Sequence, residues 1–321
     1  MRILFITSTR VGDAILSTGL LDHLIREYPD ARITVACGGA ATSLFEAVPG
    51  LERVIVLDKM IFSLHWLRLW ALCIGRFWGA VVDLRNSSMY YILPSRRRWR
   101  IGRTQRNVHR IKQLAGIFSL SDRPPAPKLW LSPEKVARGE QLIGSGAPVI
   151  AVGPTANWRA KTWRAEYFVE LIERLSGDDG IIPGARVAIF GRDDERPGAL
   201  SLIDAVPKER RIDLVGHLDL LEAFACLRCC DFYVGNDSGL MHLAAASGIP
   251  TLGLFGPSPM ELYAPWGVNC EVASTSVPYE EIFPKDFDHR GSDTLMDSLS
   301  VDAAEQAARK LWTRAQSGVG K

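Results

Sequence analysis

Residues 235–239, Gly-Asn-Asp-Ser-Gly, combine the side chains and backbone freedom that a phosphate-binding loop needs. They follow a strand-like run and precede a helix rich in small residues, where free N–H groups form an anion site. Ser238 and the backbone of Gly239 could therefore hold a diphosphate. Asp237 would repel a phosphate, so we expect it to orient the loop or to contact a sugar hydroxyl. The alternative is a helix capped by Asp237 or Ser238 with no ligand.

Further side chains near predicted strand ends suit a nucleotide. Thr155 and Lys161 lie in the loop 153–163, where Lys161 could reach a phosphate as a mobile point charge and Thr155 could hydrogen-bond it. Glu195 follows another strand and could accept hydrogen bonds from the two hydroxyls of a ribose. Taken alone, a lysine or an acidic turn is more often simply solvated. His242, one helical turn after Ser238, is by itself more often structural.

Asp13 lies in the first loop, residues 9–13, where a predicted helix begins. It could be the N-cap of that helix. Alternatively it could face a ligand as a general base that takes a proton from an attacking hydroxyl. The loop has one glycine rather than the G-x-G-x-x-G fingerprint, so we do not expect dinucleotide binding of the usual kind. No residue set has clear metal-ligand spacing, and we expect neither a metal site nor a cofactor.

The chain is strongly asymmetric in charge. Residues 1–147 hold 21 basic and 11 acidic residues, a net charge of +10, whereas the remainder carries −8. No acidic residue occurs in 84–121. Such a run can be a solvated face, but its density favours an anionic partner: nucleic acid, lipid headgroup or phosphorylated sugar. The candidate anion-binding residues are Arg10, Arg85, Arg96, Arg97, Arg98, Arg100 and Arg103, and the run continues through Arg106, Arg110 and Lys112.

Strand-like runs alternate with helical patterns twice along the chain, which is typical of parallel α/β sheets. A Pro- and Gly-rich stretch, 121–148, separates the two halves. We therefore predict an N-terminal domain over 1–147 and a C-terminal domain over 148–321, with a final helix, 301–315, that could pack back on the first domain. In such folds ligands bind at the carboxyl ends of the strands.

The most apolar stretch, residues 60–79, has nearly the length of a membrane span. Arg68 near its middle would be costly in lipid, which favours an amphipathic or core helix. A helix resting on a membrane surface is the alternative. The N-terminus has the pattern of a strand rather than of a signal peptide, so we expect a cytoplasmic protein.

Together these segments resemble glycosyltransferase family 9, the ADP-heptose:lipopolysaccharide heptosyltransferases. The matching pieces are Gly12-Asp13, the K-x-W of Lys161, the G-x-x-x-E ending at Glu195, and GNDSGLMHLAAASGIPTLGLFGP over 235–257. The resemblance implies a GT-B fold, in which two Rossmann-like doubly wound domains face a central cleft. It also implies inverting, metal-independent transfer of a heptose from ADP-L-glycero-β-D-manno-heptose to the lipopolysaccharide inner core.

By this resemblance Asp13 is the general base. Thr155, Lys161, Ser238 and Gly239 hold the diphosphate, Glu195 binds the ribose, and Asp237 and His242 lie around the sugar. The acceptor would be a phosphorylated, Kdo-bearing lipid A type glycolipid on the inner face of the cytoplasmic membrane. The basic run and the 60–79 segment would meet that acceptor and the membrane surface, and no nucleic acid is expected.

Three other readings of the sequence remain open. The chain could be a family relative that uses another nucleotide sugar. It could be a non-hydrolysing sugar-nucleotide epimerase, which would change its substrate without an acceptor. It could also be a non-catalytic module that binds anionic membranes through its basic half. Such a module would not need Asp13, Lys161, Glu195 and the 235–239 loop to converge on one site.

Overall fold

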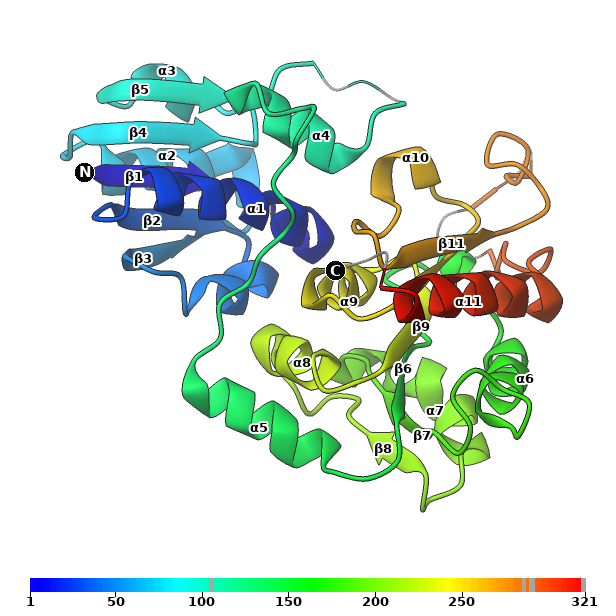
Figure 1. The fold of residues 1–321 in the computed structure, drawn as a ribbon. Coiled ribbons are helices and arrows are strands. Elements are labelled where there is room, and N and C mark those ends of the chain that lie inside the picture. The colour runs from blue at the N-terminus through cyan, green and yellow to red at the C-terminus, as the bar shows by residue number, and fades with distance from the viewer. Residues whose placement is uncertain (104, 106, 285–286, 289–291, 319–321) are drawn as a thin grey trace. The chain divides into compact units, whose positions relative to one another are not determined.

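A computed structural model describes residues 1–103, 105, 107–284, 287–288 and 292–318. Arg106 of the basic run therefore lies outside the described residues. The chain divides into two compact units, Met1–Ser132 and Pro133–Lys321. Each unit contains a parallel β-sheet with helices on both of its faces, as the alternating sequence pattern predicts (Figure 1). The described part of the chain contains no helix that is both long and apolar enough to cross a membrane.

The first unit is built on a five-stranded sheet of order β3-β2-β1-β4-β5. Its strands are β1 (Arg2–Ile6), β2 (Arg32–Cys37), β3 (Leu51–Val56), β4 (Trp78–Asp83) and β5 (Ser95–Arg100). Its helices are α1 (Val11–Glu27), α2 (Leu64–Cys73), α3 (Met89–Ile92) and α4 (Arg110–Ala115), with short 3₁₀ segments η1 (Gly39–Phe45), η2 (Ile61–Ser63) and η3 (Gly116–Phe118).

The predicted apolar helix over 60–79 is shorter in the structure. It comprises η2 and α2, and residues 78–83 form β4 instead. The buried side chains of α2 and α3, among them Leu69, Cys73 and Met89, pack on one face of the first sheet against Leu4 and Ile6. Because successive strand residues point to opposite faces, Ile3 and Phe5 are buried on the other face.

The second unit is built on a six-stranded sheet of order β11-β10-β9-β6-β7-β8. Its strands are β6 (Val149–Gly153), β7 (Arg186–Ile189), β8 (Arg211–Asp213), β9 (Phe232–Asn236), β10 (Thr251–Phe255) and β11 (Cys270–Ser274). Its helical segments are α5 (Pro133–Ile143), η4 (Arg159–Lys161), α6 (Ala165–Ser176), η5 (Asp193–Glu195), α7 (Arg196–Ala205), α8 (Leu220–Leu227), α9 (Gly239–Ser247), α10 (Met260–Tyr263) and α11 (Val301–Gln316).

The division between the units falls before α5, whereas the sequence placed it after that helix. The physical reason is a close helix contact, because a Cβ built on Gly139 of α5 would lie 2.7 Å from the backbone carbon of Ala225 in α8. The final helix α11 belongs to the second unit. Its Ala304, Ala308 and Leu311 are buried in the same core as α6.

Candidate functional site

In the second unit, the loops that follow β9, β6 and β7 leave three neighbouring strands at the same edge of the sheet. Asn236, the last residue of β9, ties two of them together. Its amide donates to the carbonyl of Pro154 at 2.8 Å, and its Oδ1 accepts the backbone N–H of Trp163 at 3.0 Å. Asn236 is completely buried. This role was not predictable from the sequence, because the two partners are 82 and 73 residues away along the chain.

Lys161 is an ion-paired residue and not a solvated lysine. Its Nζ lies 2.5 Å from Oδ2 of Asp237, and the two side chains are 22% and 8% exposed. The ammonium therefore neutralises a carboxylate that is nearly buried at the end of β9. A buried carboxylate without such a partner would cost several kcal/mol. Asp237 thus orients Lys161, which places a positive charge beside the 235–239 loop.

Ser238 is the N-cap of α9, and its Oγ accepts the backbone N–H of Met241 at 3.5 Å. The capping alternative is therefore correct for Ser238. It does not exclude an anion site, because the N–H groups of Gly239 and Leu240 precede the first intrahelical hydrogen bond, from His242 to Ser238. His242 is buried on the same helix, one turn beyond Ser238.

The phenol of Tyr233 fills the space beneath these loops. Gly153 and Gly235 are register partners on β6 and β9, and a Cβ on either would lie 2.3 Å from Tyr233 Oη. Burial raises the pKa of Tyr233 well above its ordinary value, so the phenol stays protonated. No role for Tyr233 was predicted from the sequence. The two glycines that make room for it were the available signal.

Glu195 lies at the end of η5, in the loop after β7. Its Oε2 accepts the backbone N–H of Arg192 at 2.8 Å, and its Oε1 lies 3.5 Å from Arg192 Nε. The side chain is 18% exposed, so it is more ordered than a solvated acidic turn. Thr155 lies beside the same loop, because a Cβ on Gly191 would be 3.6 Å from Thr155 Oγ1. The second unit therefore brings together Thr155, Lys161, Glu195, Asp237, Ser238, Gly239 and His242 at one sheet edge.

Asp13 lies in the first unit, in the first turn of α1. The N-cap of that helix is Arg10, so the interpretation of Asp13 as the N-cap was wrong, because Asp13 lies three residues further along the chain. Asp13 Oδ1 lies 3.8 Å from Nε of Arg110, the first residue of α4, and both side chains are less than one-fifth exposed. Arg110 appeared in the sequence only as a member of the basic run. The structure makes it the cation beside Asp13.

Arg96, Arg97, Arg98 and Arg100 lie on the edge strand β5, and their side chains divide between the two faces of the sheet. Arg98 donates to the carbonyls of Tyr91 and Leu93, and Arg100 lies over the rings of Tyr90 and Tyr91 at 5.2 Å. Arg97, on the opposite face, lies over the ring of Tyr28 at 5.8 Å. The arginines of β5 are therefore divided between two surfaces. Arg96 and Arg103 are exposed, as is Arg10 in the loop before α1.

Arg85 is separate from the strand. It follows β4, and its guanidinium lies 5.4 Å from the ring centre of Trp66 on α2. The turn that contains Arg85 is held by the buried Asp83, which accepts the backbone N–H groups of Arg85 and Ser87 at 2.8 and 2.7 Å. Burial raises the pKa of Asp83, and these hydrogen bonds partly oppose that shift. Among the described residues, no cluster of three or more His, Cys, Asp and Glu could hold a metal ion.

Comparison with known proteins identifies the family. The sequence model of glycosyltransferase family 9 (heptosyltransferase) matches residues 73–283. Lipooligosaccharide heptosyltransferase 2 of Haemophilus influenzae is 28% identical over 295 residues, which cover 80% of this chain and 84% of that protein.

Solved structures show the same fold. A glycosyl transferase family 9 protein of Veillonella parvula superposes with a TM-score of 0.78 at 20% identity, over 97% of both chains. The E. coli ADP-heptose lps heptosyltransferase II gives 0.73 at 21% identity, over 98% of this chain and 100% of the other. The fold is therefore of the GT-B type, as the resemblance to this family implied. The chain belongs to glycosyltransferase family 9, the heptosyltransferase family.

Proposed function

We propose that this glycosyltransferase moves a heptose from ADP-L-glycero-β-D-manno-heptose to a hydroxyl of the lipopolysaccharide inner core. The observation that carries the proposal is the Lys161–Asp237 pair beside the open N-terminus of α9. Departure of a nucleoside diphosphate needs positive charge or N–H dipoles at its phosphates. Relatives over most of the chain are named heptosyltransferases, which favours this donor class.

In the proposed reaction the acceptor hydroxyl attacks the anomeric carbon of the donor while its proton passes to Asp13. The bond from that carbon to the diphosphate oxygen breaks, and ADP leaves. The configuration at the anomeric carbon of the transferred sugar is inverted. Lys161, Thr155, Ser238 and the backbone N–H of Gly239 stabilise the negative charge of the leaving group. Arg110 keeps a cation beside Asp13.

The remaining residues of this edge are assigned to the nucleoside and the sugar. Glu195 already accepts a backbone N–H through one oxygen, which leaves lone pairs for ribose hydroxyls. Asp237 holds Lys161 and is assigned, with His242, to the sugar. Calorimetry with ADP, UDP and GDP tests the donor assignment, on the wild type, on Lys161→Ala and on Lys208→Ala. Lys208 is an exposed lysine and serves as the matched control.

We expect ADP to bind best, Lys161→Ala to lose at least tenfold in affinity, and Lys208→Ala to bind as the wild type does. Preference for UDP or GDP would keep the transferase but overturn the heptose donor. The acceptor requirement is tested separately, because an epimerase would alter the nucleotide sugar in the absence of any acceptor. Consumption of the donor without an acceptor would contradict the proposed reaction.

We also propose that the first unit docks on the cytoplasmic face of the membrane that carries a phosphorylated Kdo-lipid A type acceptor. Large apolar side chains are exposed around η2 and α2: Phe62 is 93% exposed, Ile61 77%, Phe77 66% and Leu67 57%. Arg68 and Arg96 are exposed in the same unit. Apolar side chains among arginines suit the interface of an anionic membrane.

Vesicle binding tests this docking. Vesicles of neutral phosphatidylcholine, with and without anionic phosphatidylglycerol, would be sedimented with the wild type, with Phe62→Ser/Phe77→Ser and with Arg68→Glu/Arg96→Glu. Val268→Ser removes an exposed apolar residue of the second unit and is the control. We expect both double variants to bind anionic vesicles several-fold more weakly and the control to be unchanged. Unchanged binding by both double variants would overturn the docking proposal and leave the donor assignment intact.

A further inference from the structure

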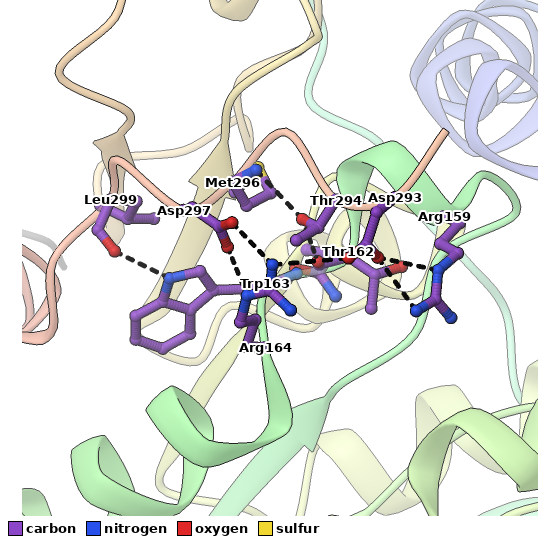
Figure 2. Close-up of polar contacts among 10 residues, drawn as sticks. Arg159, Thr162, Trp163, Arg164, Asp293, Thr294, Met296, Asp297 and Leu299 are labelled. Carbon is purple, nitrogen blue, oxygen red and sulfur yellow. Dashed lines mark hydrogen bonds and ion pairs between the residues drawn. The ribbon is translucent and has the colours of Figure 1, made fainter. Parts of the chain in front are cut away.

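The segment 293–299, here called the strap, precedes α11 and lies along the loop that carries Lys161 (Figure 2). Two hydrogen bonds join it to the backbone on either side of Lys161. The N–H of Leu295 donates to the carbonyl of Ala160 at 3.0 Å, and the Thr294 hydroxyl donates to the carbonyl of Thr162 at 2.6 Å. The strap therefore holds the peptide groups that flank Lys161, over 130 residues away in sequence.

Two carboxylates of the strap pair with arginines of the same loop. Asp297 accepts from Arg164 through both oxygens, at 2.5 and 2.7 Å, in a bidentate arrangement (Figure 2). Asp293 pairs with Arg159 at 3.0 Å. The backbone N–H of Thr294 and the Arg159 guanidinium hold the pKa of Asp293 below its usual range. Bidentate arginine–carboxylate pairs fix orientation as well as distance.

Trp163 anchors the Lys161 loop to the protein interior. Its indole N–H donates to the carbonyl of Leu299 at 2.9 Å, its ring is buried, and its backbone N–H donates to Asn236. The Lys161 loop is thus fixed between the strap on one side and the end of β9 on the other. Lys161 has a long flexible stem, so the position of its ammonium depends on the backbone from which it extends.

We propose that the strap is a positioning element for the donor, and that Thr294 and Asp297 hold the Lys161 loop in the conformation that receives the diphosphate. This inference rests on the proposed function. The strap lies beyond residues 73–283, which the family model matches. Neither side chain would touch the nucleotide; each would lower the cost of ordering the loop when the nucleotide binds.

Two conservative substitutions test the strap. Thr294→Val keeps the volume of the side chain but loses the hydrogen bonds to Thr162 and from Met296. Asp297→Asn keeps the shape but removes the charge that faces Arg164. The matched control is Asp302→Asn, which removes an exposed carboxylate that pairs with Arg174 on α6. Wild type and variants would be compared in ADP affinity, in donor and acceptor KM, and in amide hydrogen exchange of residues 156–164.

We expect Thr294→Val and Asp297→Asn to weaken ADP about 3- to 10-fold and to raise the donor KM in parallel, as expected from the loss of one or two hydrogen bonds. The acceptor KM should not change, amide exchange in 156–164 should accelerate, and Asp302→Asn should match the wild type. In a Lys161→Ala background neither substitution should weaken ADP further, because the strap acts through Lys161.

Additive losses in the Lys161→Ala background would overturn the proposal, since the strap would then act on stability or through another group. Unchanged ADP affinity in both strap variants would also overturn it. A wild type that bound no ADP would refute the donor assignment and, with it, the role of the strap. A wild type that bound ADP while the variants bound it equally well would refute the strap alone.

Discussion

Lys161 has two roles: it neutralises the nearly buried carboxylate of Asp237, and it is assigned to the diphosphate of the donor. The ammonium compensates a carboxylate that is 8% exposed. Lys161→Ala should therefore destabilise the fold by about 1–3 kcal/mol, because Asp237 is left buried without its cation. The double variant Lys161→Ala/Asp237→Asn removes the orphaned charge and should recover most of that loss. ADP affinity should not recover, since the cation is still absent.

Urea denaturation at pH 7 measures the stabilities, and calorimetry measures ADP binding on the same samples. The single variant Asp237→Asn is the third corner of the cycle. If the double variant recovered ADP affinity together with stability, the weaker binding of Lys161→Ala would be a consequence of misfolding. Lys161 would then have no direct role at the diphosphate.

Asp13 is the residue to which we assign proton transfer. Asp13→Asn removes the base but preserves the shape of the side chain in the first turn of α1. A general base contributes about 10²- to 10⁴-fold to the rate, so turnover should fall by at least 100-fold. ADP affinity should be unchanged, because Asp13 belongs to the first unit and the nucleotide residues to the second. Asp30→Asn, an exposed carboxylate of the first unit, is the control.

Initial-rate kinetics with donor and acceptor provide the test. A variant that kept more than a tenth of the wild-type turnover would remove Asp13 from the role of base. A variant that lost turnover and ADP affinity together would point instead to an unfolded protein. The two outcomes are separated by the melting temperature, which we expect to be close to that of the wild type.

Helices and strands differ in how well they could be predicted from the sequence. Helices such as α6 and α9 are recognisable from the sequence, because apolar residues recur at helical spacing in α6, and α9 lies between the Ser238 cap and Gly248. The edge strand β5, Ser-Arg-Arg-Arg-Trp-Arg, was missed and treated only as a charge run. An edge strand has one paired neighbour and largely exposed faces, so it needs no apolar alternation. The guanidinium groups of Arg97 and Arg100 lie over the rings of Tyr28, Tyr90 and Tyr91 instead.

The candidate site, too, was only partly predictable from the sequence. The residue types at the strand ends predicted that Lys161, Glu195 and the 235–239 loop would lie near one another, and these three belong to the second unit, whereas Asp13, which the prediction grouped with them, belongs to the first. The contacts that fix them were not predictable, since Asn236 and the strap act on partners 73 to 136 residues away. Spacing along a chain reveals which loops share a sheet edge, but it does not reveal which side chains touch.

Besides its apolar contacts, α11 is held to β11 by a partly buried carboxylate that pairs with two cations of the helix. Glu271 Oε2 accepts from Arg314 at 2.8 Å and lies 3.3 Å from Lys310 Nζ. Burial alone would raise the pKa of Glu271, but hydrogen bonds from Arg314 and Lys310 outweigh burial and hold it below its ordinary value of 4.5. Because the folded-state pKa is lowered, the stabilisation is present above the unfolded pKa and is lost as the pH falls through the folded value.

Glu271→Gln should therefore destabilise the protein by about 0.5–1.5 kcal/mol at pH 7, a modest value for a partly exposed pair. The difference from the wild type should begin to shrink as the pH falls below 4.5, the ordinary value, and should be lost as the pH falls through the lowered folded-state pKa. Denaturant titrations at pH 7 and at a series of pH values below 4.5 measure it, with the exposed Glu209→Gln as control. A difference that stayed constant with pH would mean that the packing of Glu271, and not its charge, holds α11.

At the scale of the whole molecule, the helix α5 decides where one folding unit ends and the other begins. It packs so closely on α8 that only glycine fits at position 139, and Lys135 pairs with Asp219 and Glu222 at the start of α8. Ile143 is buried as well. A fragment of residues 133–321 should therefore fold cooperatively and bind ADP. A fragment of residues 148–321, cut at the boundary that the sequence suggested, leaves the α5-facing surface of α8 in water.

We expect the shorter fragment to be less stable by several kcal/mol or to aggregate, because burial of apolar surface stabilises by about 25 cal/mol per Å² and α5 covers much of α8. Thermal unfolding followed by circular dichroism compares the two fragments, and calorimetry compares their ADP affinities. Gly139→Leu in the longer fragment is an independent probe, since a large side chain would push α5 off α8 and reproduce the defect without any deletion. Equal stability of the two fragments would mean that α5 is part of the connection between the units and not of the second unit, as the composition of residues 121–148 suggested.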